Sequence, residues 1–499
     1  SCVDPVGTTS DIKKSLYDHI NDCIEDFTVY YKDYLKRDVK INPDNALSSI
    51  RSLITSIRLS DYPIYLMIDE YDNFANEVMM GTHDTKDKYE ALVYGDGLLK
   101  TLFKTIKASA GKSLFDRTFI TGVSPVVMSD ITSGYNIAKN IYLKPQFNDL
   151  CGFTEKEISN ALKTIEEECG FKKGEGTAAL DIMREYYNGY SFDYKALNNV
   201  YNPTLALYFF DSFYEDCEYP DKMLDSNLAV DDAKLEYISA LPGGGQLFLD
   251  LLENDNQLTI SELEERFGIK RMLNAKSKDF TFMASFLYYF GVLTMAGRSS
   301  RGKRILRVPN MLIQGLYVDR IREMLLPEPE DRDEGVLAAE KLFEEGDIKP
   351  VCEFIEQKYF KVFSNRDYIS ANELTIKTAF LTLLYNNILY IMDSEQEISR
   401  GYSDLTMIIR PDMRQYKILD ILLEFKFVHL NQVNMTGEQA RELSREELEA
   451  IPEMQTRMTE AEEQLSRYSA ALEKKYNKLR LKKFAVVSLG FERLWTKRV

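Results

Sequence analysis

Hydrophobic residues recur at helical spacing in residues 10–60, and this pattern predicts two amphipathic helices. The pattern changes at residues 62–68, where the run YPIYLMI is short, apolar and rich in β-branched and aromatic residues. Such a run predicts a buried parallel strand. A second run, RTFIT at residues 117–121, follows a long predicted helix over residues 86–108. Strand, helix and strand in this order predict a right-handed crossover in a parallel sheet.

From residue 153 to 326 the pattern is mostly helical. Within it, residues 259–267, 279–290 and a basic turn at 298–307 between short strands predict a winged-helix-like unit. Residues 327–346 contain two prolines and a run of acids, which favour a linker.

A chain of 499 residues is too long for one hydrophobic core. We expect an α/β protein with a parallel-sheet domain over residues 1–150 and a helical and winged-helix-like domain over 151–326. A linker with helices over 327–364 would then lead to a C-terminal α/β domain over 365–499.

The composition is that of a folded globular protein, with 44% hydrophobic and 28% charged residues. No apolar run reaches 18 residues, so we expect no membrane span. The six cysteines are scattered, without a C-x-x-C pair, and predict reduced thiols in a cytoplasmic protein. The first ten residues do not resemble a signal peptide, and because the first residue is Ser1, we expect a chain truncated at its N-terminus.

Charge is unevenly distributed along the chain. The net charge of -17 argues against a protein that coats nucleic acid by charge alone. Residues 365–499 hold 20 Lys+Arg and 20 Asp+Glu, so residues 1–364, with 42 against 59, carry the whole excess. The C-terminal domain is therefore the part expected to approach phosphate.

The predicted strand at residues 418–428 (ILDILLEFKFV) carries charges on an otherwise apolar segment. Since side chains alternate along a strand, Asp420, Glu424 and Lys426 share one face. Unpartnered charges in a buried strand would cost several kcal/mol each, so a functional site is the expected reason for them. The alternative is a structural Glu424–Lys426 ion pair on an exposed edge strand.

Asp404 opens another apolar strand, and a turn at residues 410–416 would fold that strand back beside Glu424. Two carboxylates on neighbouring strands can share Mg²⁺ or Mn²⁺. The metal would polarise a phosphate and acidify a bound water, while Lys426 would orient that water or neutralise developing charge. Glu373, on a helix predicted over residues 372–385, could add a carboxylate.

These residues resemble the PD-(D/E)XK nuclease superfamily: Asp404 after Gly-Tyr-Ser, then Glu424-Phe425-Lys426, then a helix over residues 459–476 with Gln464 and Tyr468 one turn apart. The resemblance implies a restriction-endonuclease-like fold. It also implies that Asp404 and Glu424 bind metal, that Lys426 is catalytic and that Glu373 assists. In the family arginine often follows the glycine directly, whereas here Tyr402 does and the arginine is Arg400.

The strand ending in Asp69-Glu70 has the Walker B pattern, in which the aspartate holds the magnesium of a nucleotide and the glutamate prepares the attacking water. Thr121, at the end of the next strand, could act as a polar sensor. With Gly152-Phe153-Thr154 and the segments 187–190 and 201–203, these residues resemble, in order, an AAA-ATPase-like family commonly fused to a PD-(D/E)XK domain.

Gly111-Lys112-Ser113 is not a phosphate-binding loop. The motif needs glycine at 106, where the residue is Ile106, and the segment follows a helix instead of a strand. In the family the loop lies upstream of the first residue here. An incomplete P-loop-type domain is therefore expected, with ATP bound only in a full-length protein.

Two basic segments could contact nucleic acid. The predicted last helix ends in a run of lysines and arginines at residues 474–483, and the turn at 298–307 is also basic. For both, a solvated surface is the alternative.

The sequence thus predicts an intracellular ATPase-nuclease fusion that hydrolyses nucleic acid at residues 365–499. The alternatives are a non-catalytic regulatory or scaffold protein with degenerate folds, and a nucleotide-driven switch that grips DNA without cutting it. Homo-oligomerisation stays open.

Overall fold

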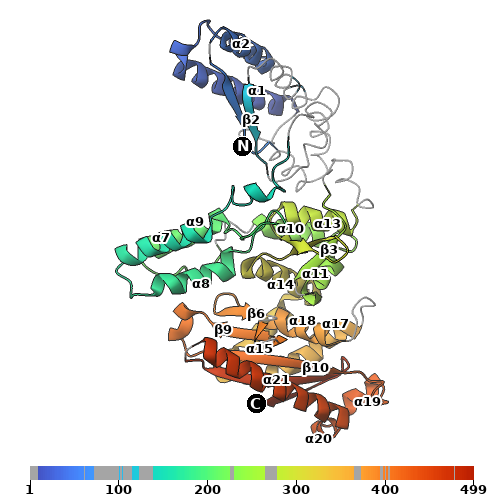
Figure 1. Cartoon of the computed structure of the whole chain (residues 1–499). Helices are drawn as coiled ribbons and strands as arrows, with labels where there is room; N and C mark the ends of the chain where they lie inside the picture. The colour runs from blue at the N-terminus through green and yellow to red at the C-terminus, as the bar shows by residue number, and fades with distance from the viewer. Residues whose placement is uncertain are drawn as a thin grey trace. The chain divides into compact units, whose positions relative to one another are not determined.

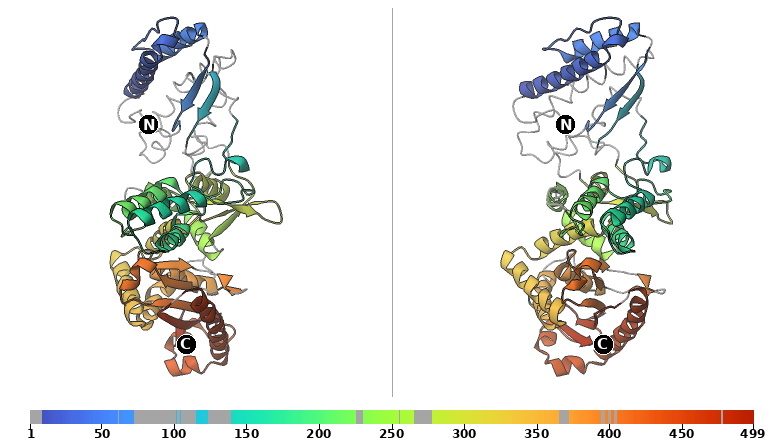
Figure 2. Two further views of the ribbon diagram at one scale, coloured as in Figure 1. Left: turned by 60° about the vertical axis from the view of Figure 1, so that its left-hand side comes forward. Right: turned by 90° about the vertical axis from the view of Figure 1, so that its left-hand side faces the viewer.

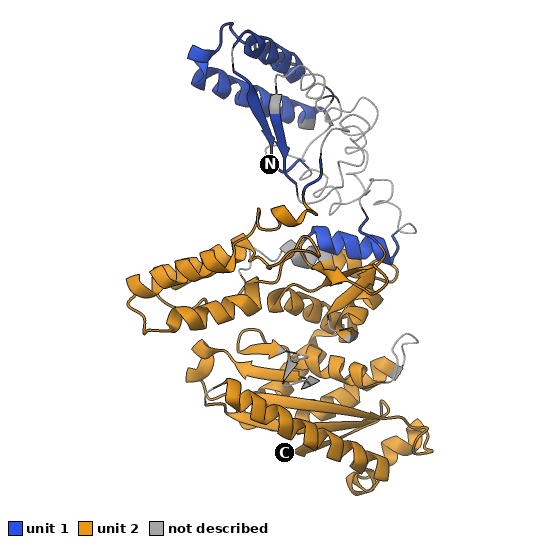
Figure 3. Ribbon diagram, viewed as in Figure 1, with its two compact units in different colours: residues 1–141, 262–290 blue, residues 142–261, 291–499 orange. Residues whose placement is uncertain are grey.

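The computed structural model divides the chain into two compact units, residues 1–141 with 262–290 and residues 142–261 with 291–499 (Figure 3). It describes residues 9–60, 62–71, 101, 104, 115–122, 139–224, 230–254, 256–264, 278–364, 372–393, 397–398, 401–402, 405–476 and 478–499.

The first unit begins with two helices, α1 (Thr9–Tyr30) and α2 (Ala46–Leu59), as predicted (Figure 1). The side chain of Asn45 caps α2 by accepting a hydrogen bond from the Ser48 amide. β1 (Ile64–Ile68) and β2 (Phe115–Ile120) then pair in parallel, which confirms the predicted strand pair. This unit also includes α13 (Phe280–Tyr289).

The prediction that β1 is buried is wrong for one of its faces. Tyr65 and Met67 are 64% and 76% exposed, whereas Ile64, Leu66 and Ile68 are half-buried. Side chains alternate along a strand, and a run of consecutive apolar residues does not reveal that one face stays open.

The second unit starts with the helices α7 (Glu155–Glu168), α8 (Glu175–Tyr187), α9 (Pro203–Glu215), α10 (Val230–Ser239), α11 (Gly244–Glu253) and α14 (Met311–Leu325). A small antiparallel sheet of β3 (Gln257–Ile260), β5 (Arg304–Arg307) and β4 (Thr294–Arg298) lies among them, in that spatial order. The predicted short strands around the basic turn are therefore present, while their grouping into a winged helix stays a prediction.

The C-terminal part contains a five-stranded sheet in the order β12 (Arg493–Arg498), β11 (Leu481–Leu489), β10 (Asp420–Val428), β9 (Leu405–Ile409) and β6 (Tyr390–Asp393). β10 and β11 are parallel and the other pairs are antiparallel. A separate two-stranded ribbon joins β7 (Glu397–Ile398) to β8 (Gly401–Tyr402). The fold is mixed α/β, as predicted.

Helices cover both faces of this sheet (Figure 2). α21 (Pro452–Lys475) packs on one face through a core that includes Leu422 and Leu465. α18 (Glu373–Leu384) packs on the other, where the rings of Phe380 and Phe425 lie 4.8 Å apart. Further elements of this part are α15 (Pro329–Glu345), α16 (Lys349–Phe354), the π-helix η5 (Ile355–Tyr359), α17 (Phe360–Ser364), the 3-10 helix η6 (Pro411–Gln415), α19 (Gly437–Glu442) and α20 (Arg445–Glu449).

The linker predicted at residues 327–346 is instead the helix α15. Pro329 occupies its first turn, where proline is well tolerated, and the acids Glu330 and Asp331 lie at the helix N-terminus, where the helix dipole favours them. Leu342 and Phe343 are buried. The prolines and acids were helix-start signals, and the same signals place the start of α21 at Pro452, before the predicted residue 459.

The prediction that all cysteines are reduced is wrong for two of them, because Cys169 and Cys217 form a disulfide across 48 residues of sequence. The pair joins the ends of α7 and α9. Their spacing carries no motif, so only the packing of these helices brings the two sulfurs together. Among the described residues, Cys23, Cys151 and Cys352 take no part in a disulfide.

Candidate active site

β10, which carries Glu424 and Lys426, is the central strand of the five-stranded sheet, and each of its residues is buried. Glu424 lies opposite Ala485 of β11 and Lys426 lies opposite Val487. The exposed-edge alternative for this pair is therefore wrong. Charged side chains at the centre of a sheet need partners there.

The Lys426 ammonium lies among three oxygen atoms. Its Nζ is 3.1 Å from Glu424 Oε1, 3.3 Å from Glu373 Oε1 and 2.7 Å from the Phe425 carbonyl oxygen. The side chains of Glu424 and Lys426 are 2% and 10% exposed, and that of Glu373 is 41% exposed. The structure thus brings together three of the four predicted catalytic residues, from β10 and from the first turn of α18.

The N-terminus of α18 positions Glu373. Asn372 is the N-cap, and its side chain accepts a hydrogen bond from the Thr375 amide, as expected for a helix that starts at residue 373. Glu373 then projects from the first turn toward β10. Lys377 is buried and lies one turn after Glu373 on the same face of α18. The i,i+4 spacing of Glu373 and Lys377 could have indicated from the sequence that a cation lies near this acid.

The fourth predicted residue, Asp404, lies outside the described residues. The strand β9 begins directly after it at Leu405, whose Cα partner is Leu423. Gln464 and Tyr468 lie on α21, as the predicted helix requires, and the Gln464 Oε1 atom is buried without a hydrogen-bond partner.

Asp420 lies on the same face of β10 as Glu424 and Lys426 but has a different role. Its carboxylate accepts two hydrogen bonds from the Arg414 guanidinium, at 2.9 and 2.8 Å. It also accepts the amides of Ile409 and Arg480, at 2.9 and 2.7 Å. Four donors satisfy this fully buried side chain, so Asp420 is a structural anchor at the other end of β10.

The basic run at residues 474–483 lies toward that same end, because Leu481 pairs with Asp420. Arg480 uses its guanidinium to donate to the carbonyl oxygens of Tyr416 and Arg414, at 2.6 and 2.9 Å. At least this member of the run braces the loop before β10.

The structure also brings together the predicted nucleotide-binding residues Asp69, Glu70 and Thr121, at the ends of β1 and β2. The Thr121 hydroxyl donates to Asp69 Oδ1, and the Glu70 amide donates to the same atom at 3.1 Å. The Thr121 amide donates to the Ile68 carbonyl at 2.9 Å. The segment 111–113, which the sequence predicts not to be a phosphate-binding loop, lies outside the described residues.

The aromatic-glycine segment at residues 187–190 is structural. Gly189 has φ +105°, and a Cβ atom built there would lie 1.9 Å from the Pro309 carbonyl oxygen. The Asn188 carbonyl accepts from the Asn310 side chain at 3.0 Å. Only glycine fits this backbone and this contact.

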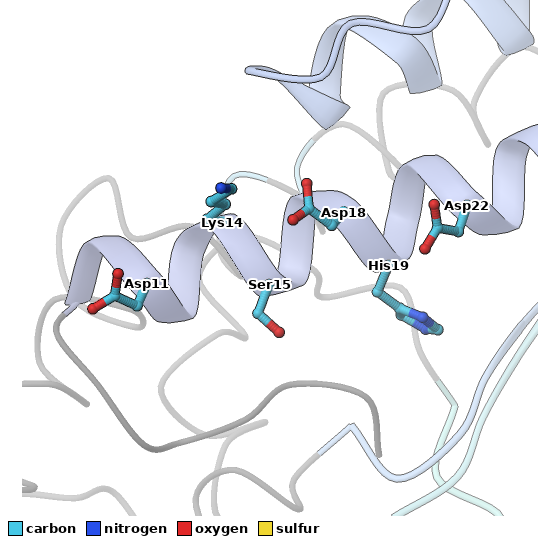
Figure 4. Close-up of a pocket in the computed structure, with 6 residues that line it drawn as sticks. All are labelled: Asp11, Lys14, Ser15, Asp18, His19 and Asp22. Atoms are coloured by element: carbon cyan, nitrogen blue, oxygen red, sulfur yellow. The ribbon is translucent and has the colours of Figure 1, made fainter.

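A hollow of about 540 Å³ along α1 is polar but offers no metal site (Figure 4). The described residues that line it belong to this helix and are Asp11, Lys14, Ser15, Asp18, His19 and Asp22. In the described part of the chain, no three His, Cys, Asp or Glu side chains are grouped closely enough to hold a metal ion. Nor does any described helix have the length and apolar character to cross a lipid bilayer.

Comparison with protein families confirms both resemblances. Residues 371–497 match a family described as PD-(D/E)XK nuclease superfamily, and residues 4–132 match a family described as predicted AAA-ATPase. The chain thus joins an AAA-ATPase-like domain to a C-terminal PD-(D/E)XK nuclease-type domain. No curated protein and no solved structure matches it.

Proposed function

We propose that the C-terminal domain is a metal-dependent nuclease that hydrolyses phosphodiester bonds of nucleic acid. The observation that carries this proposal is the Lys426 ammonium held between Glu424 and Glu373 at the centre of the sheet. A lone structural ion pair would not require a third charged group on another element.

The donor set fits a hard divalent cation. The three side chains carry two negative charges and one positive charge, and carboxylate oxygens are the ligands that Mg²⁺ and Mn²⁺ prefer. We propose Glu424 and Asp404 as the metal ligands. Leu405, which follows Asp404 in the sequence, pairs with Leu423, which precedes Glu424.

The metal, when bound, would polarise the scissile phosphate and lower the pKa of a coordinated water. Side chains of the protein would supply the other charged groups that the reaction needs. Lys426 positions a positive charge for the negative charge that develops on the phosphate, and Glu424 and Glu373 hold the ammonium in place. The low exposure of Glu424 and Lys426 strengthens these interactions because little water screens them.

For the first unit we propose a nucleotide-linked role. Asp69 would hold the magnesium of a bound nucleotide, Glu70 would prepare the water and Thr121 would sense the terminal phosphate. Thr121 and Asp69 are already joined by a hydrogen bond at the strand ends. Binding of ATP would also require the backbone amides of a phosphate-binding loop.

Cleavage of labelled DNA and RNA, single- and double-stranded, in Mg²⁺ and then Mn²⁺ tests the nuclease. Lys426→Ala should lower the rate by roughly 10²–10³-fold, the typical cost of removing one electrostatic contact to the transition state. Lys483→Ala makes the same change on the adjacent strand β11 and should leave the rate unchanged.

Equal cleavage by the wild type and Lys426→Ala would refute the role of Lys426. A metal-binding measurement separates a catalytic from a scaffold protein. At 100 times its Kd, Mn²⁺ should stabilise the folded chain by about 2.7 kcal/mol. Glu424→Gln should abolish that gain, and a wild type that metal does not stabilise would favour the scaffold.

A further inference from the structure

The β4–β5 hairpin is a compact ribbon with a defined turn. The Ser299 amide donates to the Lys303 carbonyl and the Gly302 amide donates to the Ser299 carbonyl, both at 2.9 Å. Gly302 has φ +75°, which glycine adopts without strain. A bulge between Met295 and Gly297 increases the twist of the ribbon. Figure 2 shows the hairpin extending past the neighbouring helices.

This hairpin is strongly basic in an acidic protein. Residues 291–310 contain five Lys or Arg and no Asp or Glu, although the whole chain has a net charge of -17. Arg298, Arg301 and Lys303 are exposed. Among the described residues, none of these three cations forms an ion pair with a carboxylate. Unneutralised cations gathered on a fixed ribbon attract a polyanion.

Tyr194 extends this surface beyond the hairpin. The Arg298 guanidinium lies 4.2 Å from the centre of the Tyr194 ring, and the Lys195 ammonium lies 5.5 Å from it. The ring therefore contacts two cations, Arg298 of the hairpin and the neighbouring Lys195, through cation–π interactions. An arginine stacked on an aromatic ring keeps its edge N–H groups available for phosphate oxygens.

Arg307, at the base of the hairpin, adds an independent observation. Its Nε atom is buried without a hydrogen-bond partner. Burial also lowers the pKa of this guanidinium.

We propose that the β4–β5 hairpin, with Tyr194 and Lys195, binds the sugar-phosphate backbone of the nucleic acid that the C-terminal domain acts on. This inference rests on the proposed function, because the nuclease supplies the reason for a nucleic-acid ligand. The second unit includes both the hairpin and the candidate active site.

The hairpin fits nucleic acid better than a membrane. A two-stranded ribbon can enter the major groove of B-DNA. Residues 299–303 at the tip are Ser, Ser, Arg, Gly and Lys, so the tip offers no apolar side chain to insert among lipids. Arginine also recognises phosphate through paired hydrogen bonds.

Fluorescence anisotropy tests this binding with labelled 20-base-pair DNA, and with RNA of the same sequence, in EDTA at several salt concentrations. The variant with Arg298→Gln, Arg301→Gln and Lys303→Gln should bind roughly tenfold or more weakly near 0.1 M salt. The slope of log K against log salt should fall by about 2 to 3 for DNA.

A matched control variant makes the same charge change elsewhere in this unit. Lys163, Lys172 and Lys173 are exposed on α7 and on the turn after it. Changing all three to Gln should alter the affinity less than twofold. The variant Arg301→Gln with Lys303→Gln changes only the turn and should show about two thirds of the loss in slope. It tests the proposal even if the triple variant does not fold.

Affinity and slope that are unchanged in the hairpin variant would overturn the proposal, and so would a wild type that binds no nucleic acid. Hairpin-dependent binding to phosphatidylserine vesicles that is tighter than binding to DNA would overturn the choice of ligand. Hairpin-dependent DNA binding without Lys426-dependent cleavage would refute the proposed nuclease but not the binding of nucleic acid by the hairpin. Lys426-dependent cleavage together with DNA binding that the hairpin variant leaves unchanged would support the nuclease and refute the role of the hairpin.

Discussion

Replacing Asp420 tests whether its burial is structural, in contrast to that of Glu424 on the same face of β10. Asp420→Ala removes an acceptor that satisfies four donors, two on the Arg414 guanidinium and two backbone amides. Breaking a buried ion pair from one side typically costs about 3–5 kcal/mol. The two amides left without an acceptor add to the cost, at roughly 1–3 kcal/mol each if water does not reach them.

Because such contributions are not additive, we expect a total loss of about 3–5 kcal/mol or slightly more. Asp420→Asn keeps one acceptor oxygen and should cost about half as much. A domain of roughly 130 residues loses about 3–4 °C of Tm per kcal/mol, so Asp420→Ala should lower the transition of the C-terminal part by roughly 10 °C or more.

Thermal unfolding followed by circular dichroism measures this change. Asp211→Ala is the matched control, because Asp211 is exposed on α9, and it should shift stability by less than about 0.5 kcal/mol. Equal melting of the Asp420 and Asp211 variants would refute the structural role. The folded Asp420→Ala protein should keep its cleavage rate, because six residues of strand place Lys426 roughly 20 Å away.

Three further predictions address the disulfide, a glycine and a buried acid. Reducing the Cys169–Cys217 disulfide, or changing both cysteines to Ser, should lower stability by about 2–4 kcal/mol, as measured by the Tm with and without reductant. Gly189→Ala should cost roughly 2 kcal/mol or more in denaturant unfolding, because its backbone is left-handed and a carbonyl oxygen occupies the space of the new methyl group. Burial raises the pKa of Glu356, although the Leu494 amide and the nearby Arg493 partly oppose it. The stabilising contribution of Glu356 is therefore fully present below its unfolded pKa and is lost as the pH rises through the folded pKa, so Glu356→Gln should gain stability relative to the wild type between about pH 4 and 7.

A specific result would contradict each of these three predictions. Reductant that lowers the Tm of the Cys169→Ser, Cys217→Ser variant as much as that of the wild type would deny the disulfide its role. Gly170 is a left-handed glycine with open space around it, so Gly170→Ala should lower the stability by only about 1 kcal/mol. An equal loss for Gly189→Ala would show that the contact with the Pro309 carbonyl oxygen does not matter. A pH-independent stability difference for Glu356→Gln would show that burial does not control its titration.

Local patterns were enough to find the elements that carry the candidate site. Side-chain alternation put Glu424 and Lys426 on one face of a predicted strand, and the helix predicted over residues 372–385 is present with Asn372 as its cap. Alternation and capping depend on neighbours along the chain, so the sequence holds the whole signal. The parallel pairing of β1 and β2 agrees with the crossover rule applied to the predicted order of strand, helix and strand.

Only the tertiary structure distinguished Asp420 from Glu424. Both are acids on the same face of one strand, and the difference lies in what each meets: Arg414 and two amides for Asp420, and Lys426 with Glu373 for Glu424. These partners come from other elements, and their approach depends on the pairing and packing of the sheet.

The same reason explains the disulfide and the partner of Lys426. Cys169 and Cys217 are 48 residues apart, and 53 residues separate Glu373 from Lys426. Sequence determined which side chains could do chemistry and on which elements they lie. The tertiary structure decided which of them meet, because contacts between distant segments depend on how helices and strands pack and not on the order of residues within either one.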